Sequence, residues 1–432
     1  MMKNIFNIVS SAFLLIFSFT LTAQQTPASA QSEAISITGV TAHIGNGTVL
    51  QNATLVFEDG KITAIGTNAT PKGRIINAQG KHVYPGFIAA NSTLGLVEID
   101  AVRASVDERE IGNLTPNVRS LIAYNAESKV VETTRPNGVL MGQIVPRGGR
   151  ISGTSSIVQF DAWNWEDAAV KIDDGIHLDW PTSFRRGRWW MGESRAFQPN
   201  NDYASEIQSL REYLIQAKTH RPSATETNLA FEALKGLFDG SKKLYVRANS
   251  EKEIIDAITF AKELGIKETV LVGGYQAYKI TEFLKQHNIP VLLDRTQNTP
   301  NADDEDYDLP YKMPHLLNDA GLLVGLTPVG RMERMSSRNL PFFAGQAVGY
   351  GLSKEDALKI ITSNVAKILG IDADYGTLEV GKSATLFISE GDALDMRTNK
   401  LIHAFIDGRE ISLETGQTEL YQRYSEKYNS GK

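Results

Sequence analysis

Hydrophobic and polar positions follow a regular alternation between about residues 240 and 370. Short apolar runs predict the strands Leu244–Arg247, Glu268–Val272, Ile289–Leu293 and Gly321–Leu326. Amphipathic stretches between and after them predict the helices Ser250–Leu264, Tyr275–Gln286, Leu309–Ala320, Phe342–Gly351 and Ser353–Gly370. Strands that alternate with helices at this spacing indicate a parallel sheet, hence an α/β barrel or a doubly wound fold.

Helix start signals support this pattern. Ser250 precedes a helical stretch, and Glu253 three residues later completes a capping box, in which two backbone N–H groups are satisfied reciprocally. Ser353 with Asp356 repeats the arrangement before the last helix.

Both ends of the chain carry strand patterns instead. At the N-terminal end these are Ile35–Val40, Thr54–Phe57 and Lys61–Ile65, with Asp59-Gly60 as a two-residue hairpin turn. At the C-terminal end they are Gly376–Gly381, Ala384–Ser389 and Leu401–Ile406.

Residues 100–240 are less regular, and they hold all the tryptophans of the chain: Trp163, Trp165, Trp180, Trp189 and Trp190. The span from Trp163 to Trp190 also holds Arg185, Arg186 and Arg188. Trp and Arg frequently anchor interfaces. We expect part of this region to contact a ligand or another subunit, in a homo- or hetero-oligomer; the alternative is that the rings pack the segment onto its own barrel.

Composition narrows the class of protein. The 432 residues are 42% hydrophobic and carry a net charge of −6, so neither nucleic acid nor an anionic membrane surface is expected as a partner. The absence of cysteine excludes disulfides and thiolate chemistry. Residues 1–30 have the charged start, apolar core and small residues of a secretory signal, which predicts export, most simply to a periplasm, and no membrane association after its removal.

The stretch YPGFIAANSTLGLVEI, residues 84–99, is a buried strand with polar groups at its end. It resembles the amidohydrolase superfamily, in particular the imidazolonepropionase-like branch, whose motif there is PGFIDxHxHxG. GTLEVGKSATLFI resembles a second strand of that family. The resemblance implies a (β/α)8 TIM-type barrel over residues 83–370. A composite β-sandwich domain would be built from both chain ends, 35–82 and 371–413, leaving 414–432 as a C-terminal tail.

The resemblance also implies a divalent metal, such as zinc, held at the ends of the barrel strands. At the positions where the family has metal-binding histidines, this chain has Asn91 and Thr93 on the first strand, and Arg247 and Asn249 on the fifth. The sixth strand ends in glycines, and Leu322–Gly330 contains no acid or histidine. The seven histidines show no paired ligand spacing. We therefore expect neither a metal nor another cofactor.

Arg247 would place a fixed cation at the barrel mouth. It could bind an anion such as a carboxylate, or it could pair with a local acid such as Asp294. The site candidates are therefore Asn91, Thr93, Arg247, Asn249 and Asp294.

Other patterns favour structural roles. The serines at 152–156 and 336–337 lack the elbow motif of a hydrolase nucleophile. Pro146–Arg150 could cradle an anion through its backbone but is more typical of a plain turn. Asn301–Asp308 lacks the glycine and the terminal glutamate of a calcium loop.

The sequence thus predicts an exported amidohydrolase-like protein without the metal ligands, which binds a small molecule or partners a related amidohydrolase subunit. The alternative is an active but divergent hydrolase of cyclic amides or related small molecules.

Overall fold

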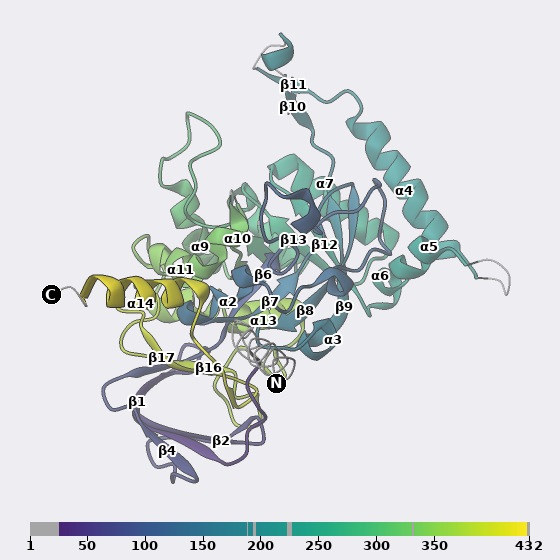
Figure 1. The fold of residues 1–432 in the computed structure, drawn as a ribbon. Helices are drawn as coiled ribbons and strands as arrows, with labels where there is room; N and C mark the ends of the chain where they lie inside the picture. Colours follow the sequence, from purple (N-terminus) through teal and green to yellow (C-terminus); the bar gives the residue numbers. More distant parts are fainter. Residues whose placement is uncertain (1–25, 188, 193–195, 223–226, 331, 430–432) are drawn as a thin grey trace, which may run out of the picture.

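The computed structural model describes residues 26–187, 189–192, 196–222, 227–330 and 332–429. Most of the predicted export signal, residues 1–25, lies outside this range. The described chain is built around a barrel-like sheet and a second large sheet beside it (Figure 1).

The barrel sheet has eight strands in the order β6-β7-β8-β9-β12-β13-β14-β15. Their bounds are Phe87–Ser92, Val139–Ile144, Ile151–Gln159, Ala169–Asp179, Lys243–Ala248, Thr269–Gly273, Val291–Leu293 and Val324–Leu326. The gap between the edge strands is bridged by the backbone of Ile360 and Ile361, whose carbonyls accept hydrogen bonds from Leu326 and Ile88 at 2.8 and 3.0 Å. The sheet is therefore nearly closed.

One strand departs from the expected parallel arrangement. β8 runs antiparallel to both β7 and β9, whereas the other neighbouring pairs of this sheet are parallel. Short connections join β7, β8 and β9, and such connections can only reverse the chain direction. The regular β/α alternation begins after β9, as the sequence pattern indicated.

Helices cover the outside of the second half of the barrel (Figure 1). The predicted capping box at Ser250 and Glu253 is present at the start of α7. The α-helices are α2 Lys129–Glu132, α3 Trp165–Ala168, α4 Tyr203–Thr219, α5 Leu229–Leu234, α6 Gly236–Asp239, α7 Glu251–Leu264, α8 Thr281–Gln286, α9 Leu309–Asp319, α10 Glu333–Ser336, α11 Leu340–Val348, α12 Lys354–Lys359, α13 Ser363–Leu369 and α14 Gly416–Asn429. The 3-10 helices are η1 Arg103–Ser105, η2 Ser120–Ala123, η3 Arg135–Asn137, η4 Trp189–Met191, η5 Ala277–Lys279 and η6 Ser337–Asn339.

Three predicted elements differ from the structure. The helix expected over 353–370 is split into α12 and α13, because the carbonyls between them bond to the barrel edges instead of continuing a helix. The helix expected over 275–286 is divided into η5 and α8. The strand expected at Gly376–Gly381 is absent, since its backbone N–H groups bond singly to two separate segments, at Ile44 just after β1 (Ile35–His43) and at Ile62.

Both chain ends contribute to the second sheet, in the order β18-β17-β16-β5-β1-β2-β3, with β4 paired to β1. The bounds are β1 Ile35–His43, β2 Val49–Glu58, β3 Lys61–Gly66, β4 Arg74–Asn77, β5 His82–Pro85, β16 Leu386–Ser389, β17 Leu401–Ile406 and β18 Arg409–Glu410. β5 and β16 join the two ends by antiparallel pairing. In Figure 1 the purple and yellow strands lie together below the barrel. A buried apolar cluster, including Ile37, Phe57 and Phe405, fills this sheet.

A separate two-stranded hairpin follows β9. It consists of β10 Phe184–Arg186 and β11 Phe197–Pro199, and it projects away from the barrel in Figure 1. Within the described residues, the helices are all too short or too polar to cross a membrane.

Candidate functional site

Parallel barrel strands deliver polar side chains to the edge where they end. There the structure contains a cavity of about 120 Å³, lined by polar groups from β6, β8, β9 and β12 and by Arg147 from the loop after β7. In parallel α/β architectures, ligands bind at this edge. The lining residues are Asn91, Pro146, Arg147, Ser152, His177, Leu178, Asp179, Tyr245, Arg247 and Val272.

Asn91, at the end of β6, is held tightly and yet keeps one free donor. Its backbone has a φ of 52°, a left-handed conformation that asparagine tolerates better than most residues. Its N–H donates to Gln143 (3.0 Å), and its Oδ1 accepts from Arg147 Nη1 (2.7 Å). The Nδ2 group is buried without a hydrogen-bond partner. A buried unpaired donor is costly unless something bound satisfies it.

Arg147 crosses the floor of the site between two strand ends. Its Nη2 donates to the Asn91 carbonyl at 2.7 Å and to Glu333 Oε2 at 3.1 Å. Glu333, in α10, also accepts from the backbone N–H and the hydroxyl of Thr93, at 2.7 and 3.3 Å. Thr93 is therefore a buried partner of a carboxylate and does not line the cavity.

Arg247, in β12, lines the cavity beside Arg147. Its Nη1 lies 3.3 Å from Asp294 Oδ2, and its Nε lies 3.7 Å from Asp179 Oδ1. The structure thus pairs Arg247 with Asp294, one of the two alternatives from the sequence. Burial acts to lower the pKa of Arg247, but the carboxylates of Asp294 and Asp179 outweigh it and raise the pKa. The side chain is still 27% exposed, so the guanidinium remains accessible.

Behind the cavity wall lies a buried polar network centred on Asp174 in β9. Asp174 accepts from Ser155 Oγ (2.6 Å) on one oxygen, and from Tyr245 Oη (2.7 Å) and Gln143 Nε2 (2.9 Å) on the other. His177 Nε2 lies 2.8 Å from Ser155 Oγ, and its ring stacks on Tyr245. Burial, together with the charges of Arg147 and Arg247, lowers the pKa of His177 well below its ordinary value, so the ring is neutral.

The predicted site residues are only partly brought together. Asn91 and Arg247 line one cavity, Asp294 binds Arg247 from outside the lining, and Thr93 is buried beside it. Asn249 is exposed, and its side chain accepts from the backbone of Tyr275 at 3.4 Å, so it shapes a turn. Sequence reasoning missed the side chains of Arg147, His177 and Glu333. The sequence pointed to two of them only indirectly. Arg147 lies in the basic loop after β7, and Glu333 follows β15, the strand whose end lacks an acid.

The donor set does not fit a divalent metal. A structural or catalytic zinc needs three or four imidazole, carboxylate or thiolate ligands around one point. Among the described residues, no three His, Asp or Glu side chains converge in this way. At the mouth itself, two guanidinium groups occupy the space and would repel a cation.

The other sequence patterns have structural explanations. Ser155 belongs to the buried network, and Ser337 donates to the carbonyl of Glu333 at 2.8 Å. In the acidic loop, Glu305 accepts from Tyr275 Oη at 2.6 Å, and Asp308 pairs with Lys312 at 2.7 Å. These contacts favour the structural interpretation of the loop.

The tryptophans differ in burial. Trp180 is buried and donates to Tyr203 Oη at 3.0 Å, and Trp165 packs partly buried against the core. Trp163 and Trp190 are exposed, the latter near the end of the projecting hairpin. Trp189 lies in η4, next to Trp190. A role in an oligomer stays a prediction.

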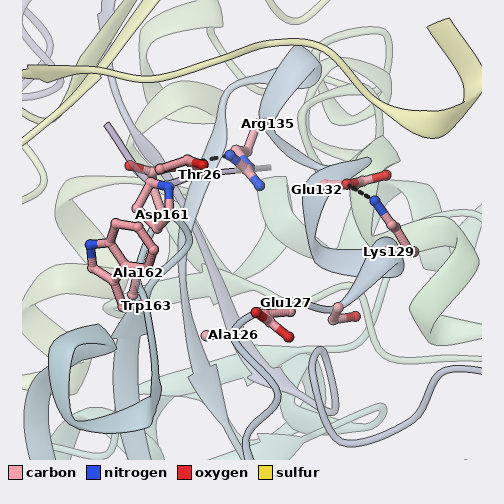
Figure 2. A pocket seen from close by; sticks show the side chains of 11 residues that line it. Thr26, Ala126, Glu127, Lys129, Glu132, Arg135, Asp161, Ala162 and Trp163 are labelled. Atoms are coloured by element: carbon pink, nitrogen blue, oxygen red, sulfur yellow. Dashed lines mark hydrogen bonds and ion pairs between the residues drawn. The ribbon is translucent and has the colours of Figure 1, made fainter. Parts of the chain in front are cut away.

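A second cavity, of about 150 Å³, lies at the opposite end of the barrel, where η3 precedes β7 and β8 ends. Figure 2 shows Arg135 directed toward Asp161, at 3.2 Å, with Thr26 close by and Lys129 toward Glu132. Asp161 also accepts hydrogen bonds from Arg409 Nη1 at 2.8 Å and from the backbone N–H of Ala28 at 2.9 Å. These bonds tie the chain ends to the barrel. At this end of a barrel such polar contacts serve stability.

Comparison with known proteins identifies the class. Residues 320–411 match the sequence profile of the Amidohydrolase family. An amidohydrolase from Thermotoga maritima MSB8 has a similar structure, with a TM-score of 0.72 and 26% sequence identity, over 88% of this chain and 99% of that one. The chain has the fold of the amidohydrolase superfamily, and the resemblance to that superfamily inferred from the sequence is confirmed.

More distant structures share the fold alone. A prolidase complexed with N-methylphosphonate-L-proline gives a TM-score of 0.54 at 14% identity, covering 88% of this chain and 99% of its own. Molinate hydrolase gives 0.51 at 19% identity, covering 89% and 95%. No curated protein sequence matches the chain.

Proposed function

We propose that this protein uses an amidohydrolase-type barrel to bind a small molecule that carries an oxyanion, such as a carboxylate, without metal-dependent hydrolysis. The observation that carries the proposal is the meeting of Arg147, Arg247 and the unpartnered Nδ2 of Asn91 in one cavity. All three are hydrogen-bond donors, and charge-assisted bonds from guanidinium to carboxylate are among the strongest in proteins.

The size and charge of the site support a small ligand. A cavity of about 120 Å³ can hold only a small molecule. Arg147 is paired with Glu333, and Arg247 is paired with Asp294. The site therefore presents guanidinium donors without a large net positive charge. We therefore expect moderate affinity and a strong requirement for the anionic group.

Calorimetric titration with N-acetylglycine tests the proposal, with the neutral N-acetylglycinamide as the matched ligand. We expect the acid to bind and the amide to bind at least tenfold more weakly. Arg147→Met and Arg247→Met should each weaken binding of the acid by about 10- to 100-fold, the cost of one charge-assisted hydrogen bond. Arg211→Met, at a comparably exposed arginine paired with Glu263, should leave binding unchanged.

Elemental analysis of the same purified protein provides the second measurement. We expect zinc, iron and manganese below stoichiometric amounts. Stoichiometric metal, or equal affinity for the acid and the amide, contradicts the proposal. Hydrolysis of N-acetylglycine by the metal-free protein, abolished in Arg247→Met, would support the alternative of a divergent hydrolase.

A further inference from the structure

His177 is a cavity-lining side chain whose neighbours fix which ring nitrogen carries its proton. It belongs to β9, and it reaches the cavity wall from the Asp174 network. The following steps rest on the proposed function, since they concern what else the bound oxyanion must carry.

Asp174 determines the direction of the hydroxyl of Ser155. The carboxylate is buried, and within the described chain Ser155 Oγ is the only side-chain donor to its Oδ1, at 2.6 Å. The other possible acceptors of that proton are the Gly175 carbonyl, at 3.3 Å, and His177 Nε2, at 2.8 Å. A short bond to a buried charge outweighs a bond to either neutral acceptor, because leaving Oδ1 unpaired is costly. Ser155 therefore donates to Asp174.

The serine then determines the tautomer of His177. Because its proton points to Asp174, Ser155 Oγ must be the acceptor in its hydrogen bond with the imidazole. Nε2 of His177 must therefore carry the hydrogen. The ring is neutral, so Nδ1 has no hydrogen and presents a lone pair. His177 lines the cavity whereas Ser155 does not, and Nδ1 is not among the buried atoms without partners. The lone pair of Nδ1 is therefore open to the cavity.

We infer that the ligand of this site carries an N–H donor close to its oxyanion, and that His177 Nδ1 accepts a hydrogen bond from it. The cavity then has two chemically distinct parts. Arg147, Arg247 and Asn91 Nδ2 donate to the oxyanion, and His177 Nδ1 accepts from the N–H group. The class of ligand is an N-acylated or otherwise N–H-bearing small acid. In a ligand with an ether or ester oxygen at that place, the oxygen lone pair would face the lone pair of Nδ1. The two would repel each other and no hydrogen bond would form.

The test compares N-acetylglycine with O-acetylglycolate, in which an oxygen replaces the N–H group. We expect the N–H ligand to bind about tenfold tighter or more, the scale of one hydrogen bond. In His177→Phe, which keeps a flat ring beside Tyr245, the ratio should fall to about one. In Arg247→Met both affinities should fall together and the ratio should persist. His287→Phe, at a histidine packed on Phe283 in another part of the fold, should change neither.

A measurement without ligand decides the tautomer independently. In a long-range ¹H–¹⁵N correlation spectrum of histidine-labelled protein, the signals lost in His177→Phe should show a neutral ring protonated at Nε2. Protonation at Nδ1, or equal affinity for the two probes, overturns the inference and leaves the proposed function intact. If neither acid binds, the proposed function fails and the ligand assignment fails with it.

Discussion

At the scale of single residues, the mouth of the barrel is organised by bonds between unlike charges. Arg147 contacts Asn91 and Glu333, and Arg247 contacts Asp294 and Asp179. These pairs keep two cations close together in a partly buried place, where unpaired charges would be expensive. They also orient the guanidinium groups before any ligand arrives, which lowers the entropic cost of binding.

Glu333 offers a test of this arrangement. Replacing it by alanine leaves the N–H group of Thr93 without its acceptor and Arg147 without its carboxylate partner, so we expect a loss of about 2 kcal/mol in the free energy of unfolding. Glu333→Gln keeps an acceptor for Thr93 and should lose less. Urea denaturation followed by circular dichroism gives the values.

The control for Glu333 is Glu282→Ala, since Glu282 is largely exposed and, among the described residues, its ion pair is with Lys285 alone. Its effect should stay within about 0.5 kcal/mol, as for most exposed ion pairs. Equal losses in Glu333→Ala and Glu282→Ala would show that the contacts of Glu333 contribute nothing beyond a surface pair.

The sequence could locate Asn91 and Arg247 because strand ends are visible as the last polar residues of apolar runs. It could not locate Arg147 or Glu333, because Arg147 reaches the mouth from a loop and Glu333 from the short helix α10, and the position of both depends on the folded barrel. The role of His177 was hidden for another reason. It depends on Ser155 and Asp174, which come from neighbouring strands and do not form a recognisable motif in the sequence.

At the scale of secondary-structure elements, the Asp174 network fastens β7, β8, β9 and β12 to one another. The strands approach closely at Gly175. A Cβ atom there would meet the ring of Tyr245 and would lie 2.7 Å from the carbonyl oxygen of Lys243. The glycine therefore allows Tyr245 to reach Asp174.

Gly175→Ala should displace Tyr245 and destabilise the protein by about 2 kcal/mol, as overpacking of a core commonly does. It should also weaken the preference for the N–H ligand, because the network then loosens around His177. Thermal unfolding and the two-ligand titration measure both effects. Gly349→Ala, where the nearest atom is the Gln346 carbonyl oxygen at 3.4 Å, is the matched control. An unchanged melting temperature in Gly175→Ala would contradict the packing argument.

Element prediction succeeded where local signals agree with tertiary structure. The capping box of α7 and the strand Leu401–Ile406 are both as predicted. The antiparallel course of β8 could not be predicted, since an apolar strand reads the same in either direction. α12 and α13 are separate because the carbonyls of Ile360 and Ile361 accept hydrogen bonds from the edge strands of the barrel. These bonds exist only in the folded molecule, so the sequence pattern could not predict the break.

At the scale of the whole molecule, Asp161 joins three distant parts of the chain: Ala28, the barrel at Arg135, and Arg409 in β18. Asp161 is buried, so each partner offsets part of its desolvation.

Arg409→Ala should cost about 3 kcal/mol, because it leaves a buried carboxylate with one fewer cation. Denaturant unfolding should show the loss together with an unchanged affinity for N-acetylglycine, since the other end of the barrel holds the proposed site. Arg397→Ala, at an exposed arginine paired with Asp395, should be near neutral. A fall in affinity equal to the fall in stability would indicate that the two ends of the barrel are coupled.

The pairing of β5 with β16 has a consequence for how the protein is made. The first strands leave the ribosome long before residues 386–389 exist, so their edge stays unmatched until those residues have been made. Contacts this far apart in a chain form late and slowly. Throughout that interval the growing polypeptide exposes an open strand edge, the kind of surface that holding chaperones protect from aggregation.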